Sequence, residues 1–149
     1  MIIFNGAIYL PTRKKAIEAM IKLLEIKPGE KIADLGAGDG RLIIAMARAG
    51  AEAHGYEINP ILVSLAKRKI KKAGLEGRAF VHLKSFWAEN FSQFDAIAIF
   101  GINDIMKKME EKLIKELKSE TRVVSNCFEF PNWKSSKKED TIFLYKKEV

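Results

Sequence analysis

The sequence predicts an α/β fold with a doubly wound, mostly parallel sheet of about six to seven strands. Two observations carry this prediction. Short apolar segments rich in β-branched residues alternate with amphipathic segments that are long enough for helices. At 149 residues and 48% hydrophobic composition, the chain also has the size of one domain that buries an ordinary core. We therefore expect a single domain over 1–149, in which 1–29 form a cap segment and a helix.

The N-terminal third begins with a helix and continues into the first central strand. Apolar residues at one-face spacing predict a helix from its cap, Thr12, to about Glu25. A short strand is expected over 31–35, and a glycine-rich loop follows it. An apolar helix over 42–49 then ends at Gly50, which is a typical helix C-terminal glycine.

The next elements continue the alternation. A second strand is expected over 52–57. Asn59 and Pro60 then form a helix start, because asparagine caps helices and proline suits their first turn. That helix is expected to end near Gly74, and a third strand covers 78–83.

The second half of the sheet follows the same pattern. "FDAIAIF", 94–100, is expected as the fourth strand, and Asn103 or Asp104 caps an amphipathic helix to about Leu117. "TRVVSNCF", 121–128, is β-branched and apolar enough to be a central strand.

The C-terminal segment departs from the alternation because no helix precedes its last strand. We expect that strand over 141–147, antiparallel beside the fifth, and a short strand near 128–133. The chain between them is brief, so one strand at this edge should be short or missing. The whole pattern describes a Rossmann-like fold with right-handed crossovers and one antiparallel strand near the C-terminus.

Composition limits the chemistry and the location. The sequence has two histidines, His54 and His82, and a single cysteine, Cys127, which we expect to be a small buried hydrophobe. Metal catalysis and histidine-based nucleophilic catalysis are therefore disfavoured. No uncharged apolar run approaches the roughly 20 residues of a membrane span, so we expect no membrane insertion and a cytoplasmic location. A net charge of +7 fits a solvated surface, or attraction to nucleic acid or an acidic protein.

The loop "GAGDG" raises the question of which ligand it holds. A dinucleotide-binding turn needs the order G-x-G-x-x-G, but the glycines here are Gly36, Gly38 and Gly40, and Arg41 stands where the third is needed. A P-loop needs Gly-Lys-Ser/Thr at its end, and that sequence is missing. Neither NAD nor ATP is favoured.

The residues around the loop suit an adenosyl amino acid. Unpaired N–H groups at the start of the next helix suit a carboxylate, and Asp34 can accept from an ammonium group. Glu57 ends the next strand, where an acid takes ribose hydroxyls in doubly wound folds. Together these features predict S-adenosylmethionine as the cofactor. The simpler alternatives are a helix cap for Asp39 and an exposed strand-end acid for Glu57.

At this point the motifs resemble a known pattern. "IADLGAGDGR" followed by "HGYEINP" resembles the nucleotide-binding motifs of class I, seven-stranded S-adenosylmethionine-dependent methyltransferases. The ordered set "YLPT", "DLGAGDGR", "GYEINPILV", "SFW", "IFG" and "FEFPNW" is similar to the family of ATP synthase c-subunit and adenine nucleotide translocase lysine N-methyltransferases. The likeness covers about Tyr9 to Tyr145.

The resemblance implies roles for individual residues. It assigns the methionine end of the cofactor to Asp34, Gly36, Ala37 and Gly38. It assigns the ribose to Glu57 and the adenine edge to Ile58 and Asn59. Tyr9 and Thr12 would close the methionine pocket.

The resemblance is less complete beside the third strand. The family's acidic residue before the tryptophan is Ser85 here, which can hydrogen-bond but carries no charge. Phe86 and Trp87 remain as stacking candidates, with core packing as the alternative for each. Phe100 begins the loop after the fourth strand, at the sheet edge where ligands bind in such folds.

The resemblance implies methyl transfer to a lysine amine of a protein substrate by in-line displacement. No catalytic residue is assigned, and Asp104 is a better helix cap than proton acceptor. The alternatives are an RNA methyltransferase and a non-catalytic cofactor-binding module. "FGIND" stands where amino-methylating nucleic-acid enzymes commonly carry N/D-P-P-Y/F, so nucleic acid is possible but not favoured as substrate.

Overall fold

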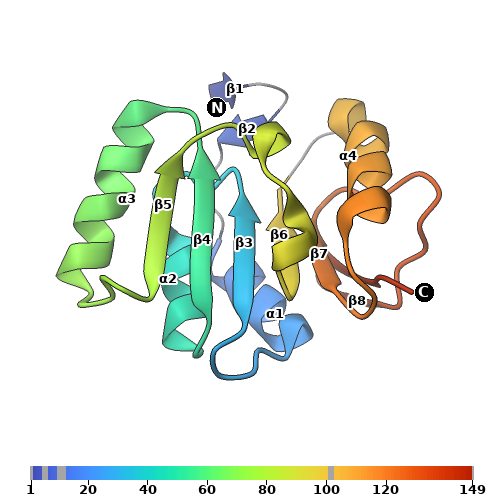
Figure 1. Cartoon of the computed structure of the whole chain (residues 1–149), viewed down its shortest axis with the longest axis horizontal. Coiled ribbons are helices and arrows are strands. Elements are labelled where there is room, and N and C mark those ends of the chain that lie inside the picture. Colours follow the sequence, from blue (N-terminus) through green and yellow to red (C-terminus); the bar gives the residue numbers. More distant parts are fainter. Residues whose placement is uncertain (1, 5–6, 10–12, 101–102, 149) are drawn as a thin grey trace.

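A computed structural model of the chain describes residues 2–4, 7–9, 13–100 and 103–148 (Figure 1). Its main sheet has seven strands in the order β5-β4-β3-β6-β7-β9-β8. These strands are β3 (Lys31–Leu35), β4 (Glu52–Glu57), β5 (Ala79–Leu83), β6 (Ala96–Ile99), β7 (Arg122–Asn126), β8 (Lys137–Glu139) and β9 (Ile142–Lys146). The chain winds outward from β3 to one edge and then from β6 to the other. The predicted doubly wound α/β fold is confirmed.

The direction of the strands also agrees with the prediction. β3, β4, β5, β6 and β7 pair parallel, whereas β9 pairs antiparallel with both β7 and β8. β9 is therefore the one strand of this sheet that runs against the others.

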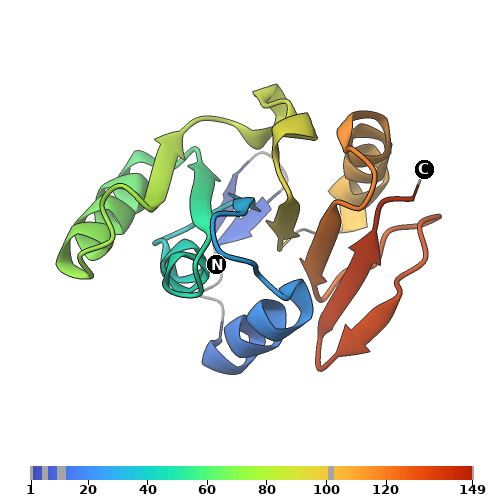
Figure 2. The same cartoon turned by 60° about the horizontal axis from the view of Figure 1, so that its bottom comes forward.

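The helices form a layer on each face of the sheet. They are α1 (Lys14–Leu24), α2 (Arg41–Arg48), α3 (Pro60–Lys72) and α4 (Asn103–Glu116). The first three lie together on one face, and α4 lies on the other (Figure 2). Each layer buries its own apolar cluster against the sheet. In the part of the chain that the structure describes, no helix has the length and apolarity that a membrane crossing needs.

The connection between β5 and β6 contains no α-helix. Two short 3-10 turns, η1 (Phe86–Ala88) and η2 (Phe91–Gln93), cover this stretch. Apolar side chains of both turns are buried under the sheet face that α4 also covers. The face over β4 and β5 therefore carries less cover than the opposite face (Figure 1).

The start of the chain differs from the prediction. α1 begins at Lys14 with Arg13 at its N-cap position, and the Arg13 side chain forms no cap hydrogen bond. Thr12, the predicted cap, lies outside the described residues. Upstream, β1 (Ile2–Phe4) and β2 (Ala7–Tyr9) form a separate antiparallel hairpin that the sequence did not predict. The hairpin lies above the carboxyl ends of the central strands (Figure 1).

The segment after β7 was predicted incorrectly. The expected strand over 128–133 is irregular, and the short edge strand is β8. In this segment a side chain accepts a hydrogen bond that strand pairing would otherwise use: the N–H of Phe130 donates to the Tyr145 hydroxyl at 3.1 Å. Cys127 is exposed with φ +75°, so it is not the expected buried hydrophobe.

Candidate functional site

The position of the site follows from the strand order. β3 pairs with β4 on one side and with β6 on the other. After β3 and β4 the chain continues to helices on one face of the sheet, and after β6 it continues to α4 on the opposite face (Figure 2). In open α/β sheets such a reversal leaves a crevice at the carboxyl ends of the strands. The glycine loop, the segment after β4 and the segment after β6 all lie at this edge (Figure 1).

The loop between β3 and α2 bends through three glycines. The φ angle is +85° at Gly36, +58° at Gly38 and +89° at Gly40, a region that favours glycine. The N–H groups of Gly36 and Ala37 donate to the carbonyl oxygen of Tyr56 at 2.9 and 3.0 Å. These bonds hold the loop against β4.

Glycine is also needed for two close approaches that the sequence analysis missed. A Cβ at Gly55 in β4 would lie 2.5 Å from the Cβ of Ala37, so glycine lets the loop rest on β4. A Cβ at Gly40 would lie 3.0 Å from the Cβ of Ala66 on α3. Gly40 therefore provides the close packing that a dinucleotide-binding turn assigns to the position of Arg41. A glycine inside a strand, as in "HGYE", is the signal that could have predicted the first contact.

Asp34 is a buried carboxyl group near the end of β3. It is 6% exposed, and no side chain or N–H among the described residues donates a hydrogen bond to it. Burial, and then the nearby charge of Glu57, raise the pKa of Asp34 to about 7. A buried carboxylate without a partner is costly. Its cost falls when a cation binds beside it, so the residue fits the predicted ammonium group.

Glu57 is buried at the end of β4 and accepts three backbone hydrogen bonds. Oε1 accepts from the N–H of Gly38 at 2.8 Å. Oε2 accepts from the N–H groups of Ile58 and Asn59, both at 3.0 Å. A carboxylate has about four acceptor positions. One position on Oε1 is left for a ribose hydroxyl, whereas the sequence analysis expected the carboxylate to take both. Glu57 is 7% exposed, not an exposed strand-end acid.

The segment after Glu57 starts α3 as predicted. The Asn59 side chain caps the helix by accepting from the N–H of Ile61 at 3.0 Å, and Pro60 occupies the first helical position. Ile58 is half-buried. The side-chain oxygen of Asn59 is thus engaged, and the N–H groups of Ile58 and Asn59 already donate to Glu57. The amide nitrogen of Asn59 is left for an adenine edge.

The segment after β5 separates the two aromatic candidates. Ser85 Oγ accepts from the N–H of Trp87 at 3.3 Å and caps η1. Phe86 is 6% exposed and belongs to the core, so packing is its role. Trp87 is half-buried and lies with its ring centroid 4.6 Å from Lys108 Nζ. Of the two, Trp87 keeps a surface that an adenine ring can reach.

Of three further candidates, only Phe100 has a side chain that the structure describes. Phe100 is half-buried, and its ring meets that of Phe128 edge-on with centroids 6.3 Å apart. Tyr9 ends β2, whose backbone is described, but its side chain and all of Thr12 lie outside the described residues. Their predicted contact with the methionine pocket stays a prediction.

Asp39 accepts a long hydrogen bond, 3.4 Å, from the N–H of Arg41, the first residue of α2. Gly40 occupies the N-cap position of α2 and has no side chain to cap that helix. The Asp39 carboxylate pairs instead with Lys69 on α3 at 2.5 Å and with Arg41 at 3.1 Å. Burial alone would raise the pKa of Asp39, but these two cations hold it below its usual value. The cap alternative for Asp39 is thus met only by the contact with Arg41 N–H, and the ion pair with Lys69 additionally joins the loop to α3.

Comparison with known proteins identifies the family. A model of the ANTKMT methyltransferase domain matches residues 34–137, which include the glycine loop, Glu57 and Phe100. The chain belongs to this family. The sequence resemblance to lysine N-methyltransferases is therefore confirmed at the level of the family.

Individual relatives of the ANTKMT methyltransferase family extend the match. A protein-lysine N-methyltransferase of Saccharolobus islandicus (strain REY15A) is 34% identical over 147 residues, 92% of this chain and 91% of that protein. The ATP synthase c-subunit lysine N-methyltransferase of Homo sapiens is 38% identical over 125 residues, 84% of this chain and 53% of that protein. The chain thus spans about half the length of the human relative.

A solved structure shows the same fold. A Salinibacter ruber protein described as an RNA methyltransferase in complex with S-adenosyl-L-homocysteine superposes with a TM-score of 0.90 and is 27% identical. The match covers 93% of this chain and 94% of that one.

The methyl donor of this methyltransferase family is S-adenosylmethionine, and the residues present fit it. The unpartnered Asp34 suits the amino group, and the left-handed bend at Gly36 and Gly38 brings backbone close to the methionine end. The open acceptor position of Glu57 suits a ribose hydroxyl. Asp34, the glycine loop and Glu57 therefore lie together at one edge of the sheet (Figure 1), whereas Phe86 belongs to the core. Their contacts with the cofactor stay a prediction.

Proposed function

We propose that this domain is a protein-lysine N-methyltransferase that uses S-adenosylmethionine. The single observation that carries the proposal is Asp34, a buried carboxyl group with no partner among the described residues, beside a glycine bend and Glu57. Membership in the ANTKMT methyltransferase family supports the reaction, and the two relatives that methylate protein lysines support the class of acceptor.

The cofactor supplies a methyl carbon on a sulfonium, which a neutral amine accepts by in-line displacement. The chain's own residues bind and orient. Asp34 forms an ion pair with the ammonium group of the cofactor, and this partner stabilises the charged form of the buried carboxyl group. Glu57 holds the loop and the start of α3 together through Gly38 and Asn59, so the crevice is formed before ligand arrives.

The acceptor lysine must lose its proton before it reacts, because an unperturbed lysine amine has a pKa near 10.4. Removal from water favours the neutral amine. Phe100 and Phe128 offer apolar surface for this purpose after β6 and β7, with their rings 6.3 Å apart. We propose that the lysine side chain enters beside these rings.

A labelling experiment tests the proposal. The purified protein is incubated with methyl-labelled S-adenosylmethionine and a total protein extract, and labelled proteins are digested and sequenced by mass spectrometry. Label on lysine Nε is the expected result, and Glu57→Ala or Gly36→Val should abolish it. Glu111→Ala, a change at an exposed acid on α4, is the matched control. A protein that binds the cofactor but labels no lysine would overturn the proposal.

RNA is the second candidate acceptor, because the Salinibacter ruber relative is described as an RNA methyltransferase and the net charge here is +7. The same experiment distinguishes the two. Label that disappears on ribonuclease treatment, with none on lysine, would assign RNA as the acceptor.

A further inference from the structure

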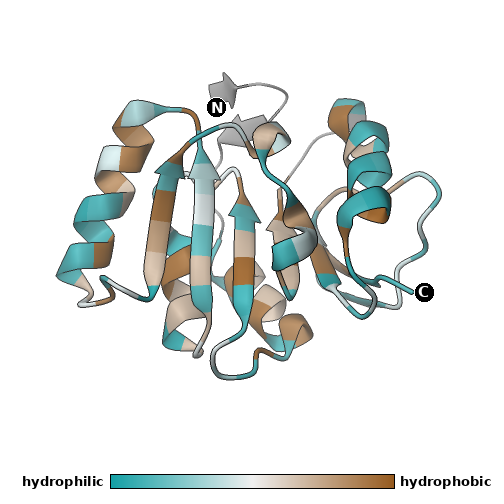
Figure 3. Cartoon of the chain, viewed as in Figure 1, coloured by the Kyte–Doolittle hydropathy of each residue, from teal (hydrophilic) through white to brown (hydrophobic). Residues whose placement is uncertain are grey.

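The outer face of α3 carries positive charge that no acid in the described part of the chain neutralises. Lys67, Arg68, Lys71 and Lys72 are exposed, and none of them forms an ion pair there. The helix sequence contains no acidic residue. Its remaining cation, Lys69, pairs with Asp39. We call the four unpaired residues the basic face; Figure 3 shows α3 hydrophilic over much of its length.

The basic face borders the open edge of the sheet. β5 is the terminal strand, and parallel pairing directs alternate backbone groups outward. The carbonyl of Arg78 and the N–H of Lys84 point inward to β4, so the backbone groups of Val81 point outward. A hollow of about 440 Å³ lies here between α3 and β5. We call it the edge hollow; its lining includes Lys67, Ile70, Glu76, Gly77, Phe80 and His82.

Phe80 and His82 line the edge hollow from the side of the sheet face opposite α3, because side chains alternate along β5 and Ala79 and Val81 pack with α3. Phe80 and His82 are half-buried, and the Phe80 ring stacks with that of His54 at a centroid distance of 4.9 Å and an angle of 14°. Burial, followed by His54 and the nearby lysines, lowers the pKa of His82, although Glu89 acts to raise it. Aromatic rings, outward backbone donors and acceptors, and a row of cations therefore meet along one edge.

We propose that the basic face and the edge hollow form a binding surface for single-stranded nucleic acid. Phosphates would contact the cations of α3, and a base would enter the hollow against Phe80. The surface is distinct from the crevice at the carboxyl edge. It would hold RNA whether the methyl acceptor is a protein or an RNA.

The magnitudes favour a polyanion over other acidic partners. Exposed lysine–carboxylate pairs contribute little to binding, so an acidic peptide gains little from four exposed cations. A nucleic acid gains more, because each neutralised phosphate releases condensed counterions. An anionic membrane is flat and would leave the edge hollow unfilled.

Salt-dependent binding tests the surface without using methyl transfer. Fluorescence anisotropy measures the affinity of a short labelled oligouridylate for the wild type and for Lys67→Gln/Lys71→Gln at several salt concentrations. For single strands the log–log salt slope is about −0.7 per phosphate contact. We expect the double variant to lose about 1.4 from the magnitude of the slope.

A matched control removes the same charge elsewhere. Lys115→Gln/Lys134→Gln changes two exposed lysines on α4 and the loop after β7, and it should leave the slope unchanged. Phe80→Leu should weaken binding about fivefold or more with the slope kept, because stacking is not a charge effect. Equal losses in both double variants would overturn the proposal. So would preferential binding of an acidic peptide or of anionic vesicles at the basic face.

Discussion

At the scale of single residues, Asp34 has the most unusual environment in the crevice. Its carboxyl group is enclosed by protein, and the described residues offer it no hydrogen-bond donor. Glu57, the other buried acid of the site, accepts three N–H groups. Their roles therefore differ: Glu57 holds the backbone of the glycine loop and of the start of α3, whereas Asp34 is free to bind a cation.

The affinity for S-adenosylmethionine should pass through a maximum near pH 7 to 8. Below the Asp34 pKa of about 7 the carboxyl group is neutral, so affinity should rise about tenfold per pH unit toward that value. An α-amino group loses its proton above about pH 7.7–8.0, and affinity should then fall. Isothermal titration calorimetry between pH 5 and pH 9 measures the profile.

Asp34→Asn identifies the group responsible for the acid side of this profile. The variant should bind more weakly at pH 7 and lose the dependence below pH 7. Asp140→Asn, a change at an exposed acid, should keep the wild-type profile. If the affinity of Asp34→Asn for S-adenosylmethionine still rises between pH 5 and pH 7, another group causes this pH dependence.

At the scale of elements, the fit between the glycine loop and β4 depends on one missing methyl group. Gly55→Ala should displace the loop, because its Cβ would lie 2.5 Å from that of Ala37. We expect a stability loss of about 1–3 kcal/mol and weaker cofactor binding. Chemical denaturation and calorimetry measure the two effects.

The partner of that contact provides a rescue. Ala37→Gly removes the opposing Cβ, so the double variant should recover part of the loss; Ile43 side-chain atoms at 3.3 Å limit the recovery. Additive losses in the double variant would show that the two residues do not compete for this space.

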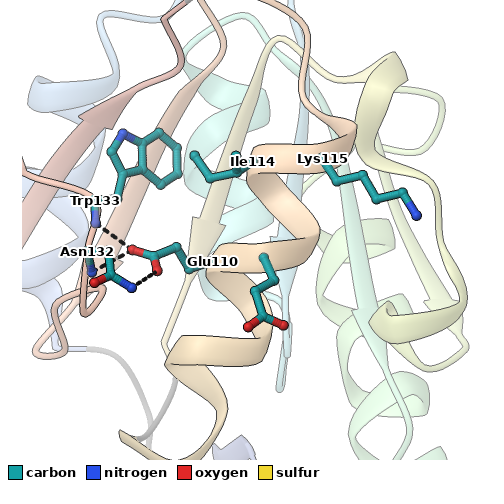
Figure 4. A pocket seen from close by; sticks show the side chains of 6 residues that line it. Glu110, Ile114, Lys115, Asn132 and Trp133 are labelled. Atoms are coloured by element: carbon teal, nitrogen blue, oxygen red, sulfur yellow. Dashed lines mark hydrogen bonds between the residues drawn. The ribbon is translucent and has the colours of Figure 1, made fainter.

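Glu110 connects α4 to the irregular segment after β7. Its carboxylate accepts from the backbone and side chain of Asn132, at 2.8 and 3.0 Å, and from the N–H of Trp133 (Figure 4). Glu110→Ala should cost about 1–3 kcal/mol, because N–H groups lose their acceptor. Glu110→Gln should retain most of the stability, since one oxygen can still accept both backbone bonds.

Hydrogen exchange gives a local measurement of this contact. The amides of Asn132 and Trp133 should exchange faster in Glu110→Ala than in Glu110→Gln. The amide of Val124 in β7, which pairs with β6 and not with this segment, serves as the internal reference. Unchanged exchange at Asn132 in Glu110→Ala would contradict the role of Glu110.

At the scale of the whole molecule, Asp34 also affects stability. Its folded pKa of about 7 lies above the ordinary 3.8, so the folded state holds a proton that the unfolded state releases between these values. The contribution of Asp34 to the free energy of unfolding is complete below about pH 4. It is lost as the pH rises to about 7, by about 1.4 kcal/mol per pH unit.

Urea unfolding of the wild type and Asp34→Asn isolates this effect. The stability of the variant relative to the wild type should increase from pH 5 to pH 7 and then stay constant. The difference between the two proteins cancels His82, whose lowered pKa acts in the opposite direction. Parallel profiles would show that Asp34 is not buried unpaired in solution.

Sequence periodicity predicted most of the sheet, because β3 through β7 and their helices obey local patterns. The antiparallel entry of β9 was also predicted, since no helix precedes it. A short strand at the far edge was expected and is present as β8, but it lies at 137–139 and not at 128–133. Tyr145 and Glu110 accept the backbone N–H groups of Phe130 and Asn132, and neither contact is visible in a local pattern.

In the candidate site, too, local sequence patterns predicted some features, and contacts between distant residues decided the others. The bend at Gly36 and the acid Glu57 follow from motif spacing, and the structure brings them together. The ion pair of Asp39 was not predicted, because its partner Lys69 lies beside it in space but 30 residues away in sequence. The burial of Phe86 likewise depends on tertiary packing. The cytoplasmic location stays a prediction.

The order of strands at the β8 edge bears on synthesis as well as on structure. β8 is translated before β9, yet it pairs only with β9, which must insert between β7 and β8. Until residues 142–146 leave the ribosome, β7 exposes an unpaired edge, and such edges recruit other chains. A nascent chain stalled before Thr141 should therefore be the form that most needs a chaperone.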